Sequence, residues 1–398
     1  MASAQNPLLA RTGIPKFDEI KPHHIGPAVT QVLQEANNGL TQIESNLSPT
    51  WEGLIRPLEE MGIPFEYAWG PVQHLLSVNN TNELRAEHEK MLPQVIEFGL
   101  RMGQSKPIYE GLLAMRDGPE WDSLNESQRR VINLKIRDAK LAGVGLPQDK
   151  REEFNRITTK LSKLATDFSN NVLDSTKAYE FIIKSKAETE GWPINLVQLS
   201  SQSYNHEKKT DESSPETGPW RITLEAPMLI PFLRHSKVRH QREKLLKAYV
   251  SRADSGDLDN KPLIREILQL RSEKAKLLGY ESFAEMSLEA KMAPDVEAVQ
   301  RMFHELFEAS KPKSLVEFKE IEEIAENMGQ KESLKHWDTA FWSERLKEER
   351  FRFTDDQLRP YFPFPKVLEG MFRLAESLFG VEIKETEETA PKWHPDVI

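Results

Sequence analysis

The chain has 398 residues, a length that predicts two or three domains. Of these residues 38% are hydrophobic and 29% charged, a composition typical of a globular protein. A formal net charge of -10 argues against non-specific binding to nucleic acid or to anionic membranes, because both carry negative charge. The chain has no cysteine, which excludes disulfides, thiolate metal sites and cysteine nucleophiles.

Helical periodicity dominates the sequence. Ser123 followed by Glu126 predicts a capping box at the start of a helix, and Gly143 is suited to a left-handed cap at its end. A longer helix is expected over residues 154–172, where apolar residues recur every three or four positions and line one face. The inward positions predicted for these two helices are Val131, Leu134 and Ala139, then Phe154, Ile157, Leu161, Leu164, Phe168 and Val172.

Strand signals are few and fall in the middle of the chain. Residues 179–183, 196–199 and 220–224 are short, apolar or alternating segments that predict a small sheet. Between them, residues 201–218 are rich in Ser, Glu and Lys, which indicates a solvated loop.

Amphipathic helices are expected again after this insertion. Asn260 is a candidate cap for a helix that ends at Gly279. One further helix follows Pro294, a second spans residues 315–328, and a third spans residues 365–379 and ends at Gly380. Residues 381–383 and 393–398 are expected to be extended. The inward positions predicted for these helices include Ile264, Ile267, Leu268, Ala275, Val296, Val299, Phe303, Phe307, Leu315, Phe318, Ile321, Ala325, Val367, Leu368, Met371 and Phe372. The fold class is therefore mainly α, with a small β insertion.

Zinc hydrolases commonly supply two metal ligands and a base from His-Glu-x-x-His on one helix face. Three His-Glu pairs occur, at His88, His206 and His304, and none has a second His four residues after the first. His304 and Glu308 lie one helical turn apart, but a surface pair is the favoured interpretation. His23 and His24 are adjacent, and a loop or capping role is favoured for them over metal binding.

Two other groups of residues invite a functional interpretation. Asp257, Asp259 and Asn260 lack the spacing of a calcium loop, so turn and capping roles are favoured over ion binding. An aromatic cluster follows, for which core packing is favoured over a substrate groove; its members are Trp337, Phe341, Trp342, Phe351, Phe353, Tyr361, Phe362 and Phe364.

Several long segments resemble the oligopeptidase A and thimet oligopeptidase family of zinc metallopeptidases, in particular the plant-type oligopeptidase A enzymes. The resemblance is collinear and covers nearly the whole chain. It rests on NPLL (6–9), FDEIKPHHIGPAV (17–29), GPWRITLEAP (218–227), YVSRADSGDLDNKPLIREILQLRSEKAKLLGYESFAEMSLEAKMA (249–293), HWDTAFWSERLKEERF (336–351) and LRPYFPFPKVLEGMFRLAESLFGVEI (358–383).

The resemblance implies two mostly helical lobes on either side of a deep channel that admits short peptides. It also implies a zinc ion, held by a His-Glu-x-x-His helix and a downstream Glu that follow a Trp-x-x-Asp-Val stretch, here residues 393–397. No position of this chain matches those ligands or the later substrate-contacting residues. We therefore carry over no catalytic, cofactor-binding or metal residue, and expect the catalytic lobe to be incomplete.

Three parts are expected: an N-terminal helical domain (1–176), a small β-containing insertion with a polar loop (177–235), and a helical region leading toward the catalytic lobe (236–398). The favoured hypothesis is a truncated zinc metalloendopeptidase, inactive by itself, whose complete form cleaves short peptides. The alternative is a non-catalytic helical module that binds a peptide or a protein. No nucleic-acid or membrane partner is expected, and the oligomeric state is left open. The first twenty residues lack the patterns of a signal or transit peptide, so we expect a cytoplasmic location, with plastid or mitochondrion as the alternative.

Overall fold

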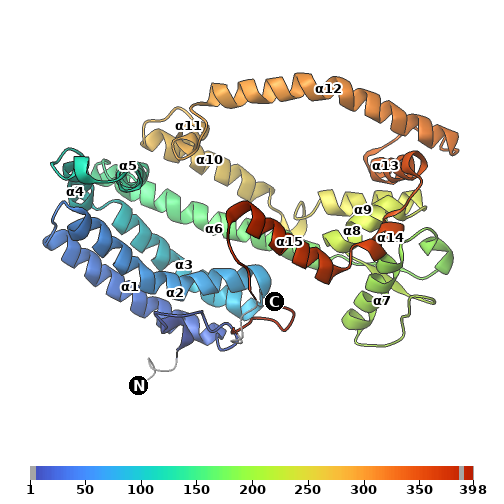
Figure 1. The fold of residues 1–398 in the computed structure, drawn as a ribbon, viewed down its shortest axis with the longest axis horizontal. Coiled ribbons are helices and arrows are strands. Elements are labelled where there is room, and N and C mark those ends of the chain that lie inside the picture. The colour runs from blue at the N-terminus through green and yellow to red at the C-terminus, as the bar shows by residue number, and fades with distance from the viewer. Residues whose placement is uncertain (1–5, 385–389, 398) are drawn as a thin grey trace. The chain divides into compact units, whose positions relative to one another are not determined.

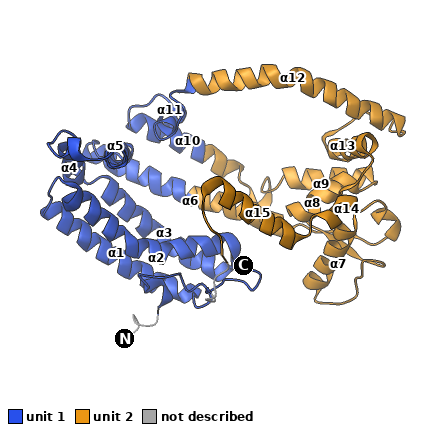
Figure 2. Ribbon diagram, viewed as in Figure 1, with its two compact units in different colours: residues 1–163, 267–296, 386–398 blue, residues 164–266, 297–385 orange. Residues whose placement is uncertain are grey.

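The computed structural model describes residues 6–384 and 390–397, which contain fifteen α-helices and one two-stranded sheet (Figure 1). The mainly α class and the small β element are confirmed. The chain divides into two compact units (Figure 2): unit 1 comprises residues 1–163, 267–296 and 386–398, and unit 2 comprises residues 164–266 and 297–385.

Unit 1 is built from helices that pack around one apolar core. Helix α1 packs along both α2 and α3, and α4 packs on α5. The core includes Ile25, Leu40, Val72 and Leu112, all of which are buried, and burial of each such side chain contributes about 1.5–3 kcal/mol. The helices are α1 (Pro22–Ser45), α2 (Arg56–Val78), α3 (Asn82–Gly103), α4 (Lys106–Arg116), α5 (Glu126–Leu141) and α11 (Phe283–Leu288), with parts of α6 (Gln148–Ala178) and α10 (Lys261–Leu277).

Local hydrogen bonds set the ends of these helices. The side chain of Asn125 accepts from the backbone N–H of Gln128 at 2.9 Å, and the Gln128 side chain accepts from that of Asn125 at 3.0 Å. The predicted capping box is thus present, but two residues later than the Ser123–Glu126 pair. Gly143 has φ +86° after the end of α5, as predicted, a conformation that only glycine adopts without strain.

The apolar face predicted for residues 154–172 lies within α6, where Phe154, Ile157 and Leu164 are buried and Leu161, Phe168 and Val172 are half-buried. In α5, however, the fully buried positions are Ile132 and Ile136. The predicted positions Val131, Leu134 and Ala139 are only half-buried.

In unit 2 a two-stranded antiparallel sheet joins β1 (Phe181–Ile183) to β2 (Trp220–Ile222), with Phe181 opposite Ile222. Two of the three predicted strands are thereby confirmed. The strand predicted at residues 196–199 was wrong. These residues lie inside α7 (Ile194–Lys208), which packs on β2. The predicted loop at 201–218 is helical up to Lys208, and its Ser213 is buried and donates to the Ser201 hydroxyl at 2.8 Å.

Unit 2 also contains the remaining parts of α6 and α10. Its other helices are α8 (Ala226–His235), α9 (Arg239–Val250), α12 (Val296–Asn327), α13 (His336–Phe351), α14 (Asp355–Leu358) and α15 (Phe364–Phe379). Its core contains Trp220, Phe232 and Leu245. Elsewhere in the described residues, short 3-10 helices occupy Pro7–Leu9, Trp121–Ser123, Lys186–Thr189, Gly256–Leu258 and Arg359–Tyr361, and a π-helical turn occupies Trp51–Ile55.

Helices α10 and α12 differ from the prediction. The helix ending at Gly279 is confirmed as α10, but Ile264 and Leu268, predicted to face inward, are exposed. The two helices predicted around residues 296–328 form one, α12, which continues past Pro312. Most of its apolar residues face outward, including Phe303 at 61% and Leu315 at 62% exposure.

Helix α15 and the segments after it complete the chain. The predicted helix ending at Gly380 is confirmed as α15. Residues 381–383 belong to no helix or strand, and residues 393–396 form a bend and a turn instead of the extended segment expected there; residue 398 lies outside the described part. Within unit 1, Trp393 packs against His74, with ring centroids 4.2 Å apart, and against Phe17, at 5.2 Å.

Candidate functional site

The His-Glu pairs lie on separate elements: His88 on α3, His206 on α7 and His304 on α12. His304 and Glu308 are exposed on α12, which confirms the surface interpretation. His88 is buried and stacks on Trp69 at 4.8 Å between ring centroids, and burial lowers its pKa. His88 is therefore a core side chain.

The other candidates also have structural roles. His24 accepts a hydrogen bond from the backbone N–H of Lys21 at 3.1 Å, which confirms its capping role at the start of α1. Burial lowers the pKa of His24, and His23 and Lys21 lower it further. Asp259 accepts from the backbone N–H of Lys261 at 2.9 Å, a capping contact at the start of α10.

The side chain of Asn260 contacts the middle of α6 instead of capping the helix for which it was predicted. Its side chain donates to the backbone carbonyl of Phe168 at 3.1 Å and accepts from the Asn171 side chain at 2.9 Å. The buried Asn260 side chain thus serves α6 rather than the first turn of α10.

The aromatic cluster divides into two parts. Phe341 and Trp342 are buried in a small core on α13, which confirms core packing for them. Phe351, Tyr361, Phe362 and Phe364 are exposed, at 59–78%; core packing was wrong for these four residues, because the described part of the chain places nothing over them.

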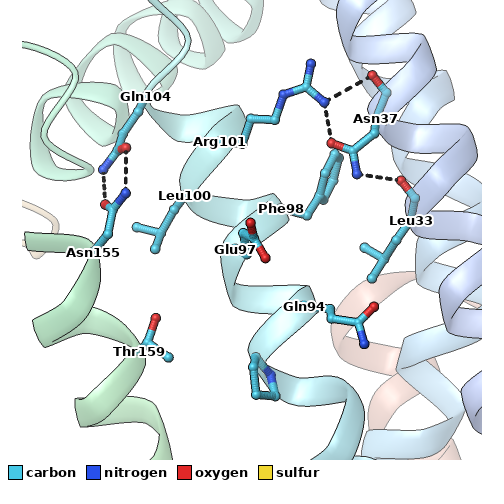
Figure 3. Close-up of a pocket in the computed structure, with 11 residues that line it drawn as sticks. Leu33, Asn37, Gln94, Glu97, Phe98, Leu100, Arg101, Gln104, Asn155 and Thr159 are labelled. Atoms are coloured by element: carbon cyan, nitrogen blue, oxygen red, sulfur yellow. Dashed lines mark hydrogen bonds between the residues drawn. The ribbon is translucent and has the colours of Figure 1, made fainter. Parts of the chain in front are cut away.

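A pocket of about 670 Å³ lies in unit 1 between α1, α3 and α6 (Figure 3), within the range of about 300–1,000 Å³ typical of small-molecule sites. Helix α3 supplies most of its lining. The lining residues are Leu33 and Asn37 from α1; Pro93, Gln94, Glu97, Phe98, Leu100 and Arg101 from α3; Gln104 just after α3; and Asn155 and Thr159 from α6.

Side-chain hydrogen bonds fix the walls of this pocket. Arg101 donates to the side chain of Asn37, to its carbonyl at 3.3 Å and to the Thr41 hydroxyl at 2.7 Å, and so ties α3 to α1. Gln104 and Asn155 exchange amide hydrogen bonds at 2.6 and 3.3 Å, which tie the end of α3 to α6 (Figure 3). The pocket is therefore held open by its own framework.

Three polar groups in the pocket are left available. Among the residues that the structure describes, the carboxylate of Glu97 and the hydroxyl of Thr159 have no hydrogen bond or ion pair, and Gln94 makes only a weak contact to the Met91 sulfur at 3.9 Å. Figure 3 shows all three residues without a dashed line. Phe98 and Leu33 supply an apolar floor.

A second pocket, of about 450 Å³, lies in unit 2 around His235, Arg345 and Asp355. Burial lowers the pKa of His235, and the nearby Arg345 lowers it further. Arg345 bonds Glu348 at 2.7 Å and Asp355 pairs with Lys347. Most charged side chains around this second pocket are therefore already paired. Fewer of them are available to bind a ligand than in the first pocket.

Comparison with known proteins places these helices in a family. The model of the Neurolysin/Thimet oligopeptidase N-terminal domain matches residues 29–151, and that of Peptidase family M3 matches residues 232–398. Probable cytosolic oligopeptidase A of Arabidopsis thaliana is 43% identical over 99% of this chain. The chain belongs to peptidase family M3. The resemblance seen in the sequence is thereby confirmed.

Other M3 relatives show the same coverage. Organellar oligopeptidase A, chloroplastic/mitochondrial, of Arabidopsis thaliana is 43% identical, and Oligopeptidase A of Haemophilus influenzae is 36% identical, each over 99% of this chain. The chain spans 56%, 50% and 57% of the lengths of these three relatives, respectively, so about half of each.

The zinc implied by the resemblance finds no fitting donor set in residues 6–384 and 390–397, where no three His, Cys, Asp or Glu side chains gather closely enough to hold a metal ion. In the same residues, no helix is long and apolar enough to cross a membrane.

The residues of the unit 1 pocket were missed by sequence reasoning, because they come from three helices and form no local motif.

Proposed function

We propose that these 398 residues are the helical, non-catalytic part of a zinc metalloendopeptidase of the oligopeptidase A type, which cleaves short peptides. The proposal rests on one observation: the match to oligopeptidase A covers 99% of this chain but only 56% of the relative. The hydrolytic residues are then supplied by sequence outside residues 1–398. The helices described here contribute walls and supports for peptide binding.

Exposed apolar faces support this proposal. On α15, Met371, Leu374 and Leu378 are 55–65% exposed, and no residue of that helix is buried. On α12, Phe303 and Leu306 are 61% and 59% exposed. Contiguous apolar surface of this kind marks sites of protein contact, which the unmatched part of the relatives' length is suited to provide.

The test is an assay of the purified chain for zinc and for peptide cleavage. A zinc hydrolase needs about three protein ligands around the metal, and the sequence lacks the His-Glu-x-x-His pattern. We therefore expect no stoichiometric zinc by metal analysis and no cleavage of a quenched fluorescent peptide above the rate without protein. Cleavage that a zinc chelator abolishes would contradict the proposal.

A non-catalytic module that binds a peptide or a protein is the second candidate, and the preformed unit 1 pocket favours it. The cleavage assay of the chain alone gives the same negative result for both candidates. Cleavage that appears when the chain is joined to the part of the cytosolic relative that it does not match separates them, since a binding module remains inactive there. The three-part division at residues 176 and 235 stays a prediction.

We propose a cytoplasmic location, by analogy with the cytosolic relative, with plastid or mitochondrion as the alternative suggested by the organellar one.

A further inference from the structure

We propose that the unit 1 pocket is a peptide-binding subsite that recognises a cationic group of a short peptide beside an apolar side chain. Glu97 provides the recognition and the floor formed by Leu33 and Phe98 provides the apolar contact. The proposed function supplies only the ligand class, a short peptide. The location and charge preference come from the pocket itself.

The preference for a cation follows from which charged side chains of the pocket lining already have hydrogen-bond or ion-pair partners. The only cation in the lining, Arg101, donates to Asn37 and Thr41 and lies 3.7 Å from the Glu44 carboxylate. The only anion in the lining, Glu97, has no such partner among the described residues. A ligand thus meets an uncompensated negative charge, on a chain whose formal net charge is -10, and both features attract a cation.

The remaining groups suit a peptide backbone. The Gln94 amide, one helical turn before Glu97, offers both a donor and an acceptor, and the Thr159 hydroxyl, from α6, does the same from another helix. Because Arg101 and the Gln104–Asn155 pair already fix the walls, binding needs little reorganisation, and less affinity is lost to ordering. A short peptide supplies a matching group for each kind of partner: an ammonium group for the carboxylate, a backbone amide for the polar side chains, and an apolar side chain for the apolar floor.

An amino-terminal ammonium and a Lys or Arg side chain share this chemistry, so the experiment has three peptide arms. Three hexapeptides with a carboxy-terminal fluorophore are titrated with the full 398-residue chain at low ionic strength: one with a free amino terminus and no Lys or Arg, one acetylated version of it, and one acetylated version with a single Lys. We expect at least one cationic peptide to bind about fivefold more tightly than the neutral one, the effect of an exposed ion pair.

Two variants place the effect at the pocket. Glu97→Gln removes the charge, and we expect it to remove the preference for cationic peptides. Gln94→Trp, at an exposed position, fills the cavity, and we expect it to weaken all binding. Glu60→Gln is the matched control, because Glu60 is exposed on α2, is outside the pocket and has no ion pair or hydrogen bond among the described residues.

The arms that bind identify the source of the charge: the amino terminus if only the free peptide binds, the side chain if only the Lys peptide binds. Equal binding of all three peptides, no detectable binding, or a Glu97→Gln variant that keeps the preference would each overturn the inference. None of these results concerns zinc content or peptide cleavage, so failure here is distinguishable from failure of the proposed function.

Discussion

At the scale of single residues, the buried carboxylate of Asp338 holds two helices of unit 2 together. It accepts hydrogen bonds from Arg239 at 2.7 Å and from Arg242 at 2.9 Å, and a third from the backbone N–H of Lys335 at 3.0 Å. Arg242 is itself buried and lies over the Phe341 ring at 4.2 Å. These contacts join α9 to α13.

Replacing Asp338 by Ala is expected to destabilise the protein strongly. The substitution leaves the buried charge of Arg242 without its partner, and removal of one member of a buried ion pair costs about 3–5 kcal/mol. Urea denaturation followed by circular dichroism measures the change in the free energy of unfolding. Asp117→Asn is the control, since Asp117 pairs with Arg116 at an exposed position and no measurable change is expected. Equal stability of the two variants would contradict this account.

The same carboxylate predicts how stability depends on pH. Burial raises the pKa of Asp338, but the hydrogen bonds from Arg239, the Lys335 backbone and Arg242 outweigh it and hold that pKa below its ordinary value. A lowered folded-state pKa gives a contribution that is fully present above the unfolded value of about 3.9 and is lost as pH falls through the folded value. Below about pH 4, unfolding of Asp338→Ala is therefore expected to depend less on pH than that of the natural chain.

At the scale of elements, most helices follow from local signals, and the errors have local causes. Gly143, Gly279 and Gly380 each mark a helix end correctly, because a left-handed residue is needed there. Helix α7 was mistaken for a strand at residues 196–199, since a short apolar run fits either element and its buried Ser200 and Ser201 interrupt the apolar pattern.

Two further features depend on distant contacts and have no signal in the sequence. Helix α12 continues through Pro312, although the missing N–H of proline usually ends a helix, whereas the sequence analysis divided its apolar residues between two helices. The unit 1 pocket depends on contacts between Arg101 and Asn37, 64 residues apart, and between Gln104 and Asn155, 51 residues apart. Periodicity shows that a helix has an apolar face but not which helix lies opposite.

Helix α15 illustrates what an uncovered face implies for behaviour in solution. Most of its apolar residues are exposed, from Phe364 at 65% to Phe379 at 75%, while Leu368 and Phe372 are half-buried. Lys366, Glu369 and Arg373 form ion pairs on its polar side. Such a face is a site of association.

We expect the 398-residue chain to self-associate, and Met371→Gln combined with Leu378→Gln to shift it toward the monomer. Both side chains are more than half exposed, so little folding stability is lost, while each buried apolar group contributes about 25 cal/mol per Å² to association. Light scattering after size-exclusion chromatography measures the mass. Lys366→Gln with Arg373→Gln, on the polar side of the same helix, is the control. A monodisperse monomer of the natural chain would count against the proposed covering of this face.

At the scale of the whole molecule, the sequence accounts for more of the fold than of the activity. The helices, most of their ends and the family can be predicted from the 398 residues, because local patterns and motifs of this sequence determine each of them. The chemistry of peptide cleavage depends on a set of converging ligands, and the described residues hold none that fits a metal ion. Under the proposed function, the converging ligands come from the part of the relatives' length that this chain does not match.

A fusion of residues 1–398 to the part of the Arabidopsis cytosolic relative that this chain does not match, about 44% of its length beside the 56% matched, tests that assembly directly. We expect the fusion to cleave a quenched fluorescent hexapeptide, to lose this activity with a zinc chelator, and to be monomeric where residues 1–398 alone self-associate. The physical reason is shared: the added sequence supplies the zinc ligands and covers the apolar faces of α12 and α15. A folded fusion that self-associates as strongly as residues 1–398 would show that these faces serve another partner, whatever its activity.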